Sequence, residues 1–60
     1  MIILTKINDV EIVINPDLIE IMQETPDTTI TLTTGRKLIV KESVDDIIDK
    51  IKIYKKQLLN

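Results

Sequence analysis

The stretch from Glu24 to Val40 restricts the possible folds of this chain more than any other, because it has the pattern of a β-hairpin. Pro26 presets φ for a tight turn before the first strand. Residues 28–33 alternate threonine with isoleucine and leucine, which is the period of two expected of a strand buried on one face. Gly35 supplies the positive φ that a hairpin turn needs, and a second strand is predicted at residues 37–41.

Three further strands are predicted nearer the N-terminus, at residues 2–7, 10–14 and 18–24, where β-branched residues are frequent. Asn8-Asp9 separates the first two, since both residue types tolerate the left-handed conformation of a tight turn. Pro16 ends the second strand, because it lacks an N–H donor and restricts the residue before it.

A C-terminal helix is predicted at residues 43–58. Ser43 is a favourable N-cap, and Asp46 takes the place of the acidic residue of a capping box. Apolar residues recur every three or four positions and form one stripe: Val44, Ile47, Ile48, Ile51, Tyr54 and Leu58. The predicted fold is therefore α+β, a single domain over residues 1–60. It comprises a small five-stranded, mostly antiparallel twisted sheet or open barrel, followed by this amphipathic helix.

The first two strands carry apolar residues on both faces, which one short helix does not cover. A chain of 60 residues buries only about 60% of its unfolded surface, although 43% of its residues are apolar. We therefore expect a homo-oligomer with Ile2, Leu4 and Val13 in its interface. The alternative is a tightly curled barrel whose own strands cover both faces.

No catalytic, cofactor or metal site is predicted. The chain has no cysteine and no histidine, which removes the thiolate, the most frequent metal ligand and the usual general base. Neighbouring carboxylates such as Asp45 and Asp46 do not face each other on a helix. Gly35 stands without the other glycines of a phosphate-binding loop. We therefore expect a protein that is not an enzyme.

Charge and hydropathy restrict the partners. No apolar run approaches the length of about 18 residues that a transmembrane helix needs. Met1 leads into a strand pattern without the features of a secretory signal, so a cytoplasmic location is expected. The net charge of −2 disfavours nucleic acid as a partner.

Charged residues without an evident structural role are the candidates for binding a partner protein. Arg36 and Lys37 lie at the predicted hairpin tip, and Lys52, Ile53 and Lys56 lie on the helix face opposite the apolar stripe. These five residues are predicted to form a protein-binding surface, whose avidity symmetric copies would raise.

The whole chain resembles the FlbD family of small flagellar proteins, also known as SwrD swarming motility proteins. The matching motifs are Met1-Ile2-x-Leu4-Thr5-Lys6-x-Asn8, Asp17-Leu18-Ile19-Glu20, Glu24-Thr25-Pro26-Asp27-Thr28-x-Ile30-Thr31-Leu32-x-x-Gly35-x-Lys37 and Val40-Lys41-Glu42-Ser43-Val44. The third motif is the most specific. Asp9 stands where glycine is expected, so the first turn requires a left-handed aspartate.

This resemblance implies a cytoplasmic bacterial protein encoded among flagellar genes and tied to swarming and to the power of the flagellar motor. It implies a non-enzymatic accessory or regulatory factor, with a flagellar motor protein or a flagellar regulatory protein as partner. The family supplies no catalytic residues.

A second resemblance points to RNA. The opening Leu4-Thr5-Lys6, the strand-rich body and the terminal helix are similar to the carbon-storage-regulator family of dimeric messenger-RNA-binding proteins. That family has an arginine near the end of its last strand, where this chain reads Val40-Lys41-Glu42. A carboxylate there would repel phosphate, which argues against RNA binding. RNA binding is therefore the alternative to the protein-binding interpretation.

Overall fold

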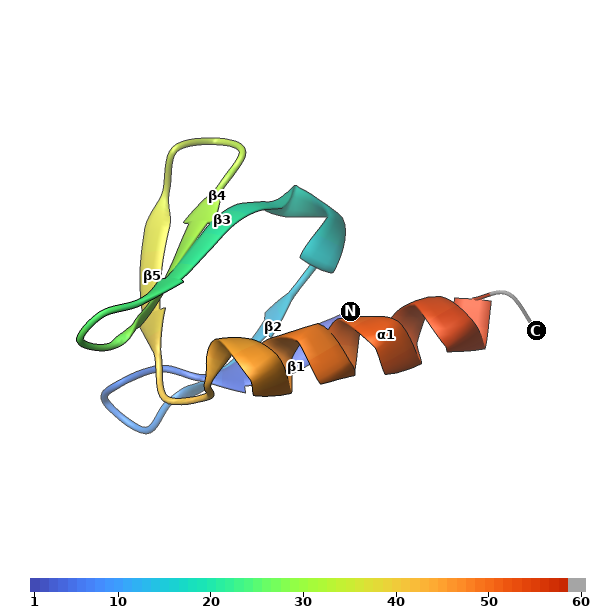
Figure 1. The fold of residues 1–60 in the computed structure, drawn as a ribbon, viewed down its shortest axis with the longest axis horizontal. Helices are drawn as coiled ribbons and strands as arrows, with labels where there is room; N and C mark the ends of the chain where they lie inside the picture. Colours follow the sequence, from blue (N-terminus) through green and yellow to red (C-terminus); the bar gives the residue numbers. More distant parts are fainter. Residues whose placement is uncertain (59–60) are drawn as a thin grey trace.

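The computed structural model describes residues 1–58 (Figure 1). Its elements in chain order are β1 (Ile2–Thr5), β2 (Glu11–Ile14), the 3₁₀ helix η1 (Pro16–Leu18), β3 (Ile19–Glu24), β4 (Thr28–Leu32), β5 (Lys37–Val40) and α1 (Val44–Leu58). The predicted α+β class, with five strands and a C-terminal helix, is confirmed. Each strand is one or two residues shorter than its predicted range.

The strands form two antiparallel sheets, so the prediction of one five-stranded sheet is wrong. β1 and β2 form a hairpin, whereas β3, β4 and β5 form a three-stranded meander. A single bridge between Lys6 and Val40 connects the two sheets, and the Lys41 N–H donates to the Thr5 carbonyl at 2.8 Å beside it. The Ile7 N–H donates to the Ile39 carbonyl at 3.3 Å on the other side of the bridge, and the chain then turns toward β2.

Two turns require a left-handed residue, as the sequence predicts. Asp9 has φ 70° in the turn between β1 and β2, and its N–H donates to the Lys6 carbonyl at 2.9 Å. Gly35 has φ 91° between β4 and β5, and its N–H donates to the Leu32 carbonyl at 2.8 Å. The turn between β3 and β4 contains a cis peptide bond before Pro26.

A β-bulge in β3 changes which of its side chains face inward. Simple alternation predicts Ile19 and Ile21 on one face. Ile19 pairs with Leu32, whereas Ile21 pairs with Thr31, so Glu20 is an extra residue in the strand. Ile19 packs against the core and Ile21 is 47% exposed, so the predicted face is wrong after the bulge.

The core lies between α1 and the inner faces of the two sheets. Its buried apolar residues are Ile2, Leu4, Ile14, Ile30, Val40 and Ile47. α1 packs against β1 and β3 and runs along the base of the molecule in Figure 1. Ile2 is 4% exposed and Leu4 is fully buried. The prediction that these two residues form an intermolecular interface is therefore wrong, because the helix of the same chain covers their face.

The N-terminus of α1 is capped by two side chains. The Asp46 N–H donates to Ser43 Oγ at 3.1 Å, as the predicted N-cap requires. The Val44 N–H donates to Glu24 Oε1 at 2.7 Å, from the end of β3. At the other end of the helix, Leu58 is 64% exposed although its spacing predicts a buried position. Figure 1 shows the last turns of α1 extending past the strands of residues 1–58, in agreement with this exposure.

Candidate functional site

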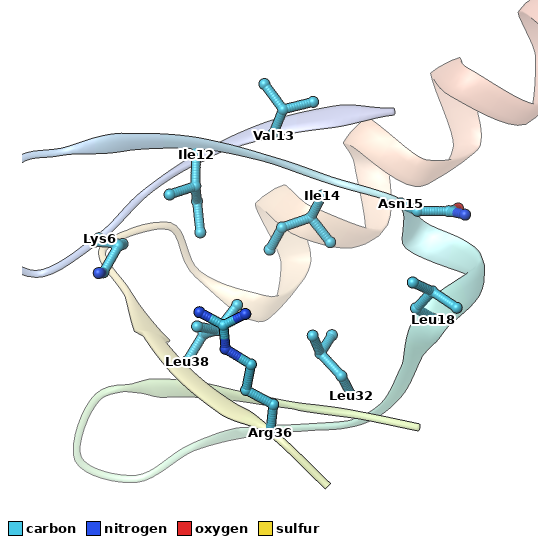
Figure 2. A pocket seen from close by; sticks show the side chains of 9 residues that line it. All are labelled: Lys6, Ile12, Val13, Ile14, Asn15, Leu18, Leu32, Arg36 and Leu38. Atoms are coloured by element: carbon cyan, nitrogen blue, oxygen red, sulfur yellow. The ribbon is translucent and has the colours of Figure 1, made fainter. Parts of the chain in front are cut away.

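An open groove of about 280 Å³ lies between the β1–β2 hairpin and the β4–β5 hairpin (Figure 2). The nine residues that line it are Lys6, Ile12, Val13, Ile14, Asn15, Leu18, Leu32, Arg36 and Leu38. Five of them are leucine or isoleucine, one is valine, and two carry a positive charge. The groove therefore combines an apolar interior with a cationic rim.

One wall of the groove is the edge of β2. Figure 2 shows Ile12 and Ile14 pointing into the groove and Val13 pointing away from it. Successive side chains of a strand point to opposite faces. Ile12, Val13 and Ile14 nevertheless all line the groove, so Val13 contributes its backbone. The groove therefore runs along the edge of the strand. Among residues 1–58, β2 pairs only with β1, which leaves this edge without a strand partner.

The opposite wall comes from the meander and from η1. Leu32 and Leu38 point into the groove from β4 and β5, because they alternate with outward-facing neighbours. Leu18 closes one end from η1, and its carbonyl accepts a hydrogen bond from the Thr33 N–H at 2.8 Å. All three leucines retain some exposure, so the groove is partly hydrated.

Two cations line the rim, and none of the lining residues is acidic. The backbone of Lys6 is held by the bridge to Val40, and the Arg36 carbonyl accepts from the Leu32 N–H at 2.8 Å. Both side chains reach the groove from opposite hairpins (Figure 2). Over residues 1–58 the ion pairs are Lys41 with Asp9 and Lys55 with Asp17, and neither involves these two rim cations.

The five residues of the predicted partner surface do not come together. Arg36 lies at the β4–β5 turn, whereas Lys52, Ile53 and Lys56 lie in the second half of α1, at the other side of the molecule (Figure 1). Lys37 is exposed on β5, where it pairs with Thr31. Arg36 therefore belongs to the groove, and the helix residues belong to a separate surface.

An exposed apolar face lies on the outer side of the β1–β2 hairpin. Ile3 and Val13 are direct cross-strand partners, 53% and 65% exposed. Ile7 extends this face toward the turn, with 53% exposure. Ile3 also shares a shallow hollow with Ile53 of α1, so the apolar surface continues onto the helix. Val13 is thus the one predicted interface residue that is accessible.

The end of β5 carries charges that are already engaged. Lys41 pairs with Asp9, and both carboxylate oxygens of Glu42 accept from the Thr5 N–H. Partial burial raises the pKa of the Glu42 carboxyl, but the hydrogen bonds from Thr5 and from its own backbone, with the charge of Lys50, outweigh burial. The net result is a pKa below its usual value of 4.5.

Among residues 1–58, no three acidic side chains gather closely enough to hold a metal ion. In the same residues, no helix is long and apolar enough to cross a membrane. Sequence reasoning missed Lys6, Ile12 and Leu18 as groove residues. The available signal was the proline after β2, which redirects the chain and leaves one edge of that strand unpaired.

Two small sheets that flank an apolar, cation-rimmed groove, with one helix across their other side, define a small α+β protein with exposed apolar surfaces. The chain belongs to the FlbD family, because the family model for flagellar and swarming motility proteins matches residues 1–59. The predicted resemblance is thereby confirmed and associates the protein with flagella and swarming. Comparisons with curated proteins and with solved structures give no match.

Proposed function

We propose that this protein is a non-enzymatic accessory or regulatory protein of the bacterial flagellum. It acts in the cytoplasm, supports swarming motility and the power of the flagellar motor, and works as an oligomeric module that binds proteins. The family match over residues 1–59 carries the flagellar part of the proposal. The exposed surfaces of the fold support the binding part.

The accessible chemistry favours binding over catalysis. Without cysteine or histidine, the candidate acids, bases and nucleophiles are carboxylates, lysines, hydroxyls and Tyr54. Glu42 is engaged with Thr5, and Glu24 with Val44, so these two carboxylates have structural roles. These observations support a protein that acts through its surface.

The outer face of the β1–β2 hairpin supports self-association. Ile3 and Val13 form the centre of an apolar face that nothing in residues 1–58 covers. A second copy can bury this face by a two-fold rotation, since such an interface is self-complementary. Ile53 lies at its margin and extends the same surface onto α1.

The partner in this proposal is a flagellar motor protein or a flagellar regulatory protein. Arg36 in the groove, with Lys37 beside it, offers one contact region. Lys52, Ile53 and Lys56 on α1 offer a second. An oligomer presents each region more than once, which raises avidity for a partner that repeats.

The proposal is tested with Val13→Lys and the control Ile21→Lys, which places the same charge on an exposed residue of the other sheet. Light scattering over a dilution series should show an oligomer for the natural protein and for Ile21→Lys, and a smaller species for Val13→Lys. In a strain that lacks the gene, only Val13→Lys should fail to restore swarming and motor torque. A monomeric natural protein, or normal swarming with Val13→Lys, would overturn the oligomeric module.

A further inference from the structure

We propose that the groove binds an extended, acidic segment of a partner protein, which adds as a strand to the free edge of β2. This inference rests on the proposed protein-binding role and specifies the kind of partner. The inward face of this segment carries apolar side chains and at least one carboxylate.

The hydrogen-bond pattern of the hairpin shows which groups of β2 are available. The Lys6 N–H donates to the Val10 carbonyl at 2.8 Å, which marks that pair as hydrogen-bonded. Pairs alternate along an antiparallel hairpin, so Glu11 and Val13 direct their N–H and C=O groups away from β1. Thr5, the partner of Glu11, behaves as this alternation requires, because its N–H and C=O contact Glu42 and Lys41.

The groove provides the place for an added strand. Its wall follows β2 from Ile12 to Asn15, and the backbone of Val13 lies at this wall while its side chain points away. Inward side chains of an added strand would pack between Ile12 and Ile14 on one side and Leu38 on the other. Main-chain hydrogen bonds and alternate side-chain pockets are the two elements of recognition by strand addition.

The charge of the rim specifies the segment further. The chain carries a net charge of −2, yet the groove has Lys6 and Arg36 and no acidic lining residue. A carboxylate on the inward face of the segment would lie within reach of both cations, and an arginine can hold it through two hydrogen bonds. A single-stranded nucleic acid is disfavoured, because it requires stacking aromatics and the one aromatic residue, Tyr54, lies outside the groove.

A second copy of β2 fits this groove less well. The inward face of β2 consists of Ile12 and Ile14, and Glu11 lies on the other face with Val13. Pairing two β2 edges would therefore bring no carboxylate to Lys6 and Arg36. This argument separates the groove from the apolar outer face, where self-association is proposed.

The test uses an array of fluorescent heptapeptides in which valine alternates with threonine and one valine is replaced by glutamate at each position in turn. Fluorescence anisotropy should show binding for at least one position of the glutamate. Replacing that glutamate by glutamine should weaken the binding about tenfold. N-methylation of the peptide amides that face β2 should abolish it. Hydrogen exchange should slow at the amides of Glu11 and Val13 when the peptide is bound.

Matched variants locate the charge effect. Arg36→Glu should weaken the affinity for the glutamate peptide at least about tenfold. It should also create binding for a peptide that has lysine in place of that glutamate. Thr34→Glu places a negative charge in the same turn, outside the groove, and should leave the affinity within about twofold. Both residues are exposed, so both variants are expected to fold.

Three results would overturn the inference: no binding by any peptide at millimolar concentration, equal effects of Arg36→Glu and Thr34→Glu, or unchanged binding after N-methylation. The last would mean that the groove takes side chains or a small amphiphile without strand addition. These peptide measurements do not depend on swarming or on oligomeric state. A protein that restores swarming through its outer face but binds no peptide would leave the proposed function standing.

Discussion

Both carboxylate oxygens of Glu42 accept a hydrogen bond from the Thr5 N–H, at 2.9 and 3.0 Å, across 37 residues of sequence. The contact lies next to the bridge between Lys6 and Val40. β5 has ended at this point, so no strand residue can accept from the Thr5 N–H at the edge of β1. The Glu42 side chain accepts from it instead. This side chain therefore adds to the backbone contacts that join the two sheets.

The Glu42 contact predicts a stability that depends on pH. The folded pKa of Glu42 lies below its usual value of 4.5, so its contribution is present above that pH and is lost as pH falls through the folded pKa. Glu42→Gln should lower the free energy of unfolding by about 1 kcal/mol at pH 7. The difference should shrink by pH about 3, because Glu42 begins to bind protons below its usual pKa.

Urea unfolding at both pH values measures this effect. Glu11→Gln, an exposed acid on β2, is the control and should show little effect at either pH. A Glu42→Gln difference that persists unchanged at low pH would contradict an electrostatic origin.

The hydrogen bond from the Val44 N–H to Glu24 predicts a capping effect at long range. Glu24→Ala leaves a free N–H at the start of α1 and removes a negative charge near the positive end of the helix dipole. The loss should be about 1 kcal/mol, or roughly 4–8 °C in Tm for a domain of this size. Thermal melts of Glu24→Ala and of its neighbour Gln23→Ala provide the comparison, and equal melting temperatures would refute the cap.

The alternation of β1 predicts opposite outcomes at adjacent positions. Leu4 is fully buried, so Leu4→Ala should cost about 2–5 kcal/mol, which is comparable to the whole stability of so small a domain. Ile3 is 53% exposed, so Ile3→Ala should leave the fold intact. Circular dichroism at 25 °C should show an unfolded Leu4→Ala and a folded Ile3→Ala. A folded, cooperative Leu4→Ala would mean that the core closes differently.

Gly35 predicts a cost that comes from the backbone alone. Its φ is 91°, and a Cβ built there meets no atom within 4 Å. Gly35→Ala should therefore destabilise by about 1–2 kcal/mol through the left-handed conformation, without a steric clash. Thr34→Ala in the same turn should stay within about 0.5 kcal/mol. Denaturant midpoints of the two variants, if equal, would show that the turn rearranges.

Local features of this fold follow from the sequence, because they depend on neighbouring residues. The left-handed Asp9 and Gly35, the N-cap at Ser43 and the inward positions of Ile30 and Leu32 all reflect turn chemistry or short-range alternation. These are the features that a single sequence encodes most directly.

Features that depend on residues far apart in the chain could not be predicted from the sequence. The bulge at Glu20 depends on the pairing of β3 with β4, and the burial of Leu4 depends on where α1 packs. The groove requires knowing that β5 meets β1 and that β2 keeps a free edge. Arg36 was predicted as a contact residue, but its neighbours in the groove come from parts of the chain that no local pattern connects.

The bridge between Lys6 and Val40 also has a consequence for synthesis on the ribosome. The β1–β2 hairpin emerges first, with apolar residues on both faces, yet its inner face needs Ile47 and its outer strand edge needs residues 39–42. A nascent chain that stops before these residues presents Ile2 and Leu4 to solvent together with Ile3 and Val13. Such a fragment is prone to aggregate, because the residues that cover this hairpin belong to later parts of the chain.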